Sequence, residues 1–128
     1  IRDTFVCTRQ YLENQKKLYP DEPLIQAATF MMLDEDNITR QTVNAQLKEH
    51  HVELSHILEV TTMDLLIQFA EIGLGIACVI RDFVKKELEE GTLVEVPVGF
   101  SFPPREIGFV CRQKDANLDL IVPFFGEE

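Results

Sequence analysis

Hydroxyl and amide side chains gather at two points where a predicted helix follows a predicted strand. The residues at these points are Asn37, Ile38, Thr39, Thr61, Thr62 and Met63. A helix N-terminus offers unpaired N–H groups and the positive end of the helix dipole, which together suit an anion. In an open α/β sheet, ligands bind outside the carboxyl ends of the strands. These residues therefore either cap their helices or also hold an anionic ligand, and capping alone is the more frequent role.

The sequence lacks the motifs that place catalytic groups. It has no GxSxG elbow, P-loop or Ser-His-Asp ordering, and Gly73 and Gly75 follow a predicted helix, which reverses the order of a dinucleotide fingerprint. The acidic run Asp34, Glu35 and Asp36 lacks the glycine and the downstream glutamate of a calcium loop, so a solvated loop explains it better. We therefore expect a binding protein that is not an enzyme, with no metal and no cofactor.

The composition predicts one globular domain over residues 1–128. Hydrophobic residues make up 45% of the chain, and no apolar run is long enough for a membrane span. The formal net charge of −10, from 22 acidic and 12 basic residues, repels phosphate and argues against direct contact with nucleic acid. Cys7, Cys78 and Cys111 lie in apolar runs without metal-ligand spacing, as buried free cysteines commonly do.

Residues 61–80 form the stretch around which we expect the other elements to pack. Thr61 is expected to cap a helix, with Asp64 completing a capping box. Gly73 marks the end of that helix, and Gly75 permits a tight turn into the next strand. This strand is apolar throughout, which is typical of a parallel strand covered on both faces. The expected apolar face of the helix consists of Leu65, Leu66, Phe69, Ala70 and Ile72.

The remaining patterns alternate between strands and helices, which indicates an α/β fold. Strands are expected at residues 3–8, 29–33, 57–60, 93–96 and 106–112, and helices at 9–18, 24–28, 38–49 and 81–90. The last of these helices is expected to turn Phe83, Val84 and Leu88 toward the core and to end at Gly91. A connector with two adjacent prolines, residues 99–105, leads to the final strand.

Residues 65–98, LLIQFAEIGLGIACVIRDFVKKELEEGTLVEVPV, resemble the effector-binding domain of LysR-type transcriptional regulators. The shared features are a helix, a glycine-flanked turn into a strand, a charged helix that ends in glycine, and a leucine-valine strand. Residues 37–40 resemble the ligand loop of that family, and residues 105–110 resemble its strand that returns across the hinge. Ile80 departs from the family pattern, which commonly has proline there.

The resemblance implies an open mixed sheet with helices on both faces, forming one lobe of a type-II periplasmic-binding-protein-like domain. Two hinge strands would flank this lobe, and most of the first lobe and the DNA-binding helix-turn-helix would lie outside the chain. Residues 37–39 and 61–63 would contact a small anionic metabolite in the cleft between lobes, which closes by hinge motion. The implied partners are a second copy of the chain, in a homodimer or larger oligomer, and DNA through the helix-turn-helix alone, in the bacterial cytoplasm.

The same resemblance implies that the hinge strands lie side by side and bring Cys7 near Cys111, so a disulfide is a hypothesis. Two other functions share the two-lobed architecture. One is a lobe of a solute-binding protein, against which the absence of a recognisable signal peptide argues. The other is an enzyme, which would need a catalytic threonine, cysteine or acid in the cleft.

Overall fold

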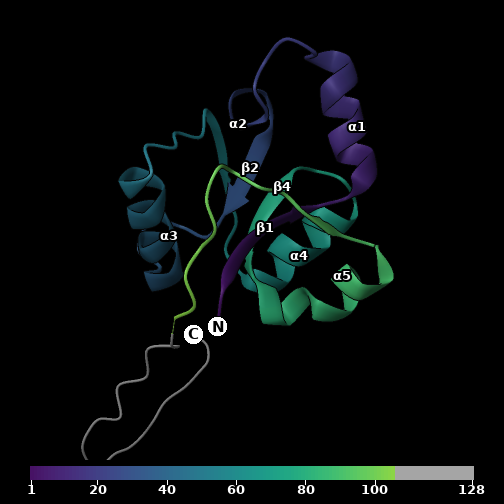
Figure 1. Ribbon diagram of the computed structural model, residues 1–128. Coiled ribbons are helices and arrows are strands. Elements are labelled where there is room, and N and C mark those ends of the chain that lie inside the picture. Colours follow the sequence, from purple (N-terminus) through teal and green to yellow (C-terminus); the bar gives the residue numbers. More distant parts are fainter. Residues whose placement is uncertain (106–128) are drawn as a thin grey trace, which may run out of the picture.

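A computed structural model describes residues 1–105, in which five strands form one sheet (Figure 1). The strands are β1 (Asp3–Cys7), β2 (Thr29–Met32), β3 (His56–Glu59), β4 (Ile76–Ile80) and β5 (Val94–Glu95). The helices are α1 (Arg9–Leu18), α2 (Leu24–Ala27), α3 (Ile38–Glu49), α4 (Met63–Glu71) and α5 (Lys85–Glu90), with a 3-10 turn η1 (Arg81–Val84). Over residues 1–105, the order of strands and helices agrees with the order that the sequence predicts.

The strands lie in the order β3-β2-β4-β1-β5. β2 runs parallel to β3 and to β4, whereas β1 runs antiparallel to β4, with Asp3 opposite Ile80, and antiparallel to β5. The sheet is therefore open and mixed, which confirms the predicted fold class. The apolar strand β4 has a parallel neighbour on one side only, and its five residues are all buried, as predicted.

Buried side chains alternate between the two faces of the sheet, as a pleated strand requires. The first face carries Phe5, Cys7, Phe30, Met32, Ile76 and Cys78. The second face carries Val6, Met31, Ala77 and Val79. α1, α2 and α3 pack on the first face, and α4, η1 and α5 pack on the second, so helices cover both faces (Figure 1).

Residues 96–102 run across the first face as an extended segment, in yellow-green in Figure 1. Val96, Val98 and Phe102 are buried there among the side chains of the first face. The Phe102 ring lies 5.7 Å from the ring of Phe5, centroid to centroid, and 4.9 Å from that of Phe100. The Phe100 ring in turn stacks on the imidazole of His50 at 4.0 Å, so the segment is attached to the end of α3.

Two side chains predicted to face the core are exposed. Ile72 is 70% exposed, because α4 ends at Glu71 and the helical spacing no longer governs the direction of the next side chain. Phe83 is 54% exposed, because residues 81–84 form a 3-10 turn with three residues per turn. Val84 is fully buried, as predicted.

The predicted strand at residues 106–112, the apolar tail that follows it and Cys111 lie outside the described residues. The proposed disulfide to Cys111 is therefore not tested. The Cys7 side chain is fully buried, and it forms no disulfide with another cysteine of residues 1–105. Among the helices of residues 1–105, none has the length and apolar character needed to cross a membrane.

Candidate functional site

The carboxyl ends of β2, β3 and β4 lie at one edge of the sheet, and the antiparallel β1 begins there. The chain leaves this edge toward opposite faces, since α3 follows β2 onto the first face and α4 follows β3 onto the second. In Figure 1 the arrow of β2 points toward this edge, where the first residue also lies. Such a switch point is where open α/β sheets bind ligands.

Helix α3 begins at this edge, with Asn37 as its cap. Asn37 Oδ1 accepts a hydrogen bond from the backbone N–H of Arg40 over 3.2 Å. Ile38, which is 72% exposed, and the half-buried Thr39 follow in the first turn. Their N–H groups have no acceptor among residues 1–105. The asparagine therefore acts as a cap and leaves two backbone donors beside the Thr39 hydroxyl.

Arg40 holds this first turn against the strand ends. Its side chain is 5% exposed, and Nη1 donates to the carbonyl of Leu33 over 2.7 Å and lies 3.4 Å from Glu59 Oε2. Its Nε donates to Asn44 Oδ1 over 3.1 Å. Because Leu33 follows β2 and Glu59 ends β3, one side chain ties the helix to both strands. Arg40 therefore fixes the start of α3 from its buried side.

Helix α4 begins at the neighbouring strand end, one residue later than predicted. The cap is Thr62, whose Oγ1 accepts from the N–H of Leu65 over 3.2 Å, so the predicted cap at Thr61 is wrong. The reason is that Val60 still donates to β2, which leaves Thr61 to carry the chain out of the strand. Thr61 and Thr62 are exposed, and Met63 packs on the second face.

Arg105 lies at the same edge, and its side chain bridges β1 and α3. Its Nε and Nη2 donate to the two carboxylate oxygens of Asp3 over 2.7 and 2.8 Å, and Nη2 also donates to Thr39 Oγ1 over 3.2 Å. The Asp3 side chain is 2% exposed and that of Arg105 is 18% exposed. Hydrogen bonding to Asp3 raises the pKa of Arg105, so its charge is secure at any physiological pH.

The sequence alone could not predict this arrangement, because Asp3 and Arg105 are 102 positions apart. The one signal for Arg105 was its place at the start of the segment that resembles the returning strand. The predicted ligand residues themselves fall into two sets, 37–39 and 61–63, at neighbouring strand ends. Within the described residues, no hydrogen bond joins one set to the other.

The loop before α3 carries the acidic run. Asp34, Glu35 and Asp36 are exposed, and Asp34 Oδ1 accepts from the N–H of Asp36 over 3.1 Å, which shapes the turn. In residues 1–105, no three histidine, cysteine, aspartate or glutamate side chains are placed to hold a metal. These exposed carboxylates therefore belong to a solvated turn.

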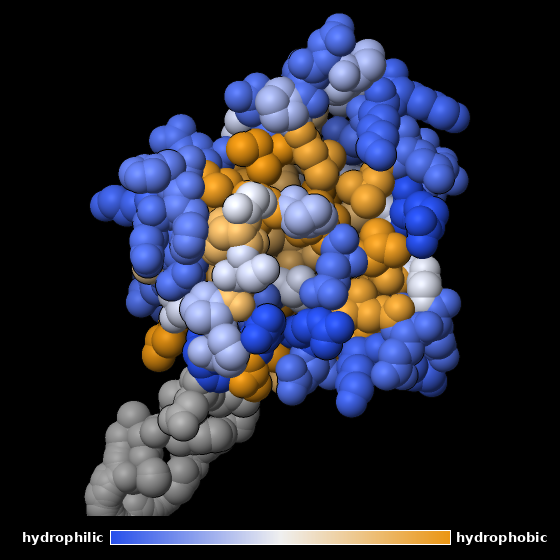
Figure 2. Space-filling model, in the orientation of Figure 1, coloured by the Kyte–Doolittle hydropathy of each residue, from blue (hydrophilic) through white to orange (hydrophobic). Residues whose placement is uncertain are grey.

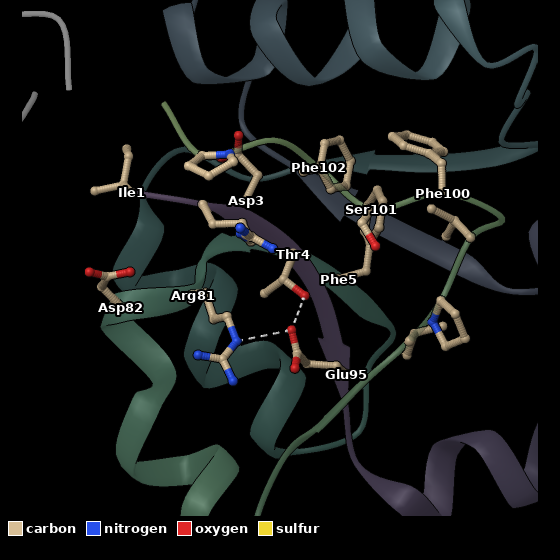
Figure 3. A pocket seen from close by; sticks show the side chains of 15 residues that line it. Ile1, Asp3, Thr4, Phe5, Arg81, Asp82, Glu95, Phe100, Ser101 and Phe102 are labelled. Carbon is tan, nitrogen blue, oxygen red and sulfur yellow. Dashed lines mark hydrogen bonds and ion pairs between the residues drawn. The ribbon is translucent and has the colours of Figure 1, made fainter. Parts of the chain in front are cut away.

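A hollow of about 740 Å³ opens on the first face, beside this edge. In Figure 2 apolar side chains gather over the middle of that face, between the more polar helices around it. Figure 3 shows Glu95 Oε2 on one side of the hollow, where it accepts from Thr4 Oγ1 over 2.8 Å and from Arg81 Nε over 3.3 Å. Phe100 and Phe102 line the other side. None of the six predicted ligand residues lines this hollow.

Several solved structures share this fold. The bromide-bound regulatory domain of HypT from Salmonella typhimurium has a TM-score of 0.59 at 20% identity, over 77% of this chain and 45% of that chain. The C-terminal domains of a LysR family protein from Agrobacterium tumefaciens have a TM-score of 0.59 at 15% identity, over 80% and 50%. The regulatory domain of CcmR from Synechocystis PCC6803, in complex with 2-PG, has a TM-score of 0.53 at 18% identity, over 73% and 45%.

At these identities the likeness to each structure shows the fold, and the chain spans about half the length of these structures or less. No curated protein matches the sequence. The sequence model of the LysR substrate binding domain, in contrast, matches residues 3–125, which is nearly the whole chain. The chain therefore belongs to the LysR substrate binding domain family.

Proposed function

We propose that this chain senses a small anionic effector as part of a LysR-type transcriptional regulator. In this proposal the ligand contacts come from Asn37, Ile38, Thr39, Thr61, Thr62 and Met63. Binding alters the arrangement of a homo-oligomer, and DNA is contacted by a helix-turn-helix that is not among these residues. The family is one of regulatory binding domains, which supports a role in sensing over a role in catalysis.

One observation carries the choice of site. Helices α3 and α4 both begin at the carboxyl edge of the parallel strands and leave toward opposite faces. Their first turns leave the N–H groups of Ile38, Thr39, Met63 and Asp64 without acceptors among the described residues. These donors and the threonine hydroxyls suit a ligand rich in hydrogen-bond acceptors, such as a carboxylate or a phosphate.

Two similar structures support an anionic ligand. The regulatory domain of HypT was solved with bromide, and that of CcmR was solved with 2-PG. The net charge of −10 disfavours anions at long range, so local donors must supply the affinity. Arg105 adds a guanidinium at this edge, although Asp3 neutralises most of its charge.

The test is calorimetric titration of the native gene product with bromide, inorganic phosphate and a panel of small carboxylates. For the ligand that binds, Thr39→Val should weaken affinity about tenfold, because one hydrogen bond to a charged group is lost. Thr42→Val is the matched control: the half-buried Thr42 donates its hydroxyl to the carbonyl of Ile38, inside the same helix, so affinity should stay unchanged. Equal affinity of wild type and Thr39→Val would refute the assignment of this loop.

The native mass of the gene product is a second measurement. A polypeptide well over twice the mass of this chain has room for a first lobe and a DNA-binding region. A native product of the size of this chain would contradict the regulator proposal, because half a cleft and no DNA-binding element would remain.

A further inference from the structure

We infer that Arg105 is a positioning residue that couples the ligand loop of α3 to the strand β1. This inference rests on the proposed function for the identity of the loop, and the contacts themselves are independent of it. The coupled elements are distant in sequence, since Asp3 begins β1, Thr39 lies in the first turn of α3, and Arg105 follows the extended segment on the first face.

The bond between Arg105 and Asp3 is the rigid part of this arrangement. Both carboxylate oxygens accept from one planar guanidinium, at 2.7 and 2.8 Å, and the Asp3 side chain is 2% exposed. A two-point pair of this kind fixes orientation as well as distance. The backbones reinforce it, because Ile1 and Arg105 exchange two N–H···O bonds of 2.6 Å each. Separation of this pair would leave a buried carboxylate without a partner, which is strongly unfavourable.

The bond between Arg105 and Thr39 is the adjustable part. It is longer, at 3.2 Å, and its acceptor is a neutral hydroxyl. The same Nη2 donates to both Asp3 and Thr39, so a shift of the first turn of α3 changes the geometry of the ion pair. A simple structural ion pair would be complete with Asp3 alone. The third contact reaches the one loop residue whose hydroxyl belongs to the proposed ligand site.

The chemistry of a hydroxyl sets the direction of the coupling. Arginine only donates, so Thr39 Oγ1 is the acceptor toward Arg105 and its own proton remains available. A ligand atom that accepts this proton polarises the hydroxyl and strengthens the bond from Arg105. A ligand atom that donates to Oγ1 can use the second lone pair and does not strengthen the bond from Arg105. An acceptor ligand therefore tightens the link between α3 and β1, whereas a donor ligand does not.

Amide hydrogen exchange of the whole chain tests the coupling without any ligand. Thr39→Val should speed the exchange of the β1 amides and of the first amides of α3 by about fivefold, the effect of losing one modest hydrogen bond. Thr42→Val, on the same helix, should leave both unchanged. Unaltered β1 exchange in Thr39→Val would overturn the inference, since no coupling would then pass through Thr39.

A second arm uses inorganic phosphate as the probe. In the wild type, saturating phosphate should slow exchange in β1 as well as in α3. In Thr39→Val at saturation the slowing should be confined to the helix starts. Equal slowing of β1 in both proteins would contradict the role of the hydroxyl. If phosphate does not slow amide exchange at the helix starts, that result counts against the proposed function only. The coupling is still decided by the measurement without ligand.

Arg105 itself needs a paired variant, because Arg105→Gln leaves Asp3 uncompensated and risks unfolding. The double variant Asp3→Asn, Arg105→Gln removes both charges together. It should fold, show the fast β1 exchange of Thr39→Val, and gain no further increase when Thr39→Val is added. An additional increase on adding Thr39→Val would show that Thr39 acts on β1 by another route and would refute the role of Arg105.

Discussion

The guanidinium of Arg40 donates a 2.7 Å hydrogen bond to the backbone carbonyl of Leu33, the residue that follows β2. This carbonyl lies at the point where the sheet gives way to the acidic turn, and Leu33 itself is buried. A buried arginine side chain normally has hydrogen-bond acceptors for its N–H groups. Besides the Leu33 carbonyl, the guanidinium of Arg40 reaches Asn44 and Glu59, and the backbone N–H of Arg40 donates to the cap Asn37. The start of α3 is thus fixed from inside the protein.

Arg40→Leu should lower the free energy of unfolding by about 2–4 kcal/mol. The substitution leaves the Leu33 carbonyl and Asn44 without their donor and replaces a filled site by a smaller side chain. Urea denaturation followed by circular dichroism measures this loss. Glu59→Gln is the control, and it should cost less than about 1 kcal/mol, because Glu59 is half exposed and 3.4 Å away. A larger cost for Glu59→Gln than for Arg40→Leu would contradict this ranking.

The two threonines before α4 should differ in their contribution to stability. Thr62→Ala should lower the free energy of unfolding by about 1 kcal/mol, because Oγ1 of Thr62 caps the helix through Leu65. Thr61→Ala should change it by less than about 0.5 kcal/mol, since Thr61 is exposed and makes no side-chain hydrogen bond among the described residues. Chemical denaturation of both variants measures this difference. A larger loss for Thr61→Ala than for Thr62→Ala would indicate Thr61 as the cap.

Local signals in the sequence were enough for the order of elements. Alternating and helical periodicities, proline breaks and glycine stops each depend on a few neighbouring residues, and Gly91 does end α5 in the left-handed conformation, at φ 83°. The same holds for Asn37, whose cap needs only the next three residues. The prediction that residues 37–39 and 61–63 bind a ligand remains a proposal.

What the sequence could not provide depends on geometry over distance or on small shifts in helix phase. Asp3 looked like the start of an ordinary strand, and only the fold brings it to Arg105. Phe83 has the spacing of a core residue, yet a 3-10 turn rotates it outward. The cap lies at Thr62 because the hydrogen bonds between β3 and β2 continue to Val60. A capping-box pattern carries no information about where these hydrogen bonds end.

Gly75→Ala should be strongly destabilising for a reason of space. A Cβ there would lie 2.7 Å from the carbonyl oxygen of Thr29, which is backbone of β2 and cannot move aside without parting β2 from β4. We expect a loss of about 1–3 kcal/mol in the free energy of unfolding. Gly91→Asn is the matched control, with a loss below about 1 kcal/mol, because nothing lies within 4 Å and asparagine tolerates positive φ. Thermal unfolding of Gly75→Ala at the wild-type midpoint would contradict the close approach.

The buried thiols should make the fold sensitive to alkaline pH. Burial raises the pKa of Cys7 from 9.0 to about 12, and it also raises the pKa of Cys78. Above pH 9 the unfolded chain therefore loses thiol protons that the folded chain keeps, so the free energy of unfolding falls as pH rises toward 12. Each thiol contributes a slope of up to about 1.4 kcal/mol per pH unit in that window and none at neutral pH.

Urea denaturation of the wild type and of Cys7→Ala at a series of pH values from 7 to 10.5 isolates the thiol contribution. All other ionisable side chains are common to both proteins, so their contribution cancels in the comparison. The wild type should lose stability more steeply than Cys7→Ala above about pH 9, and the two curves should run parallel below about pH 8. Parallel curves over the whole range would mean that the Cys7 thiolate is tolerated in the folded core.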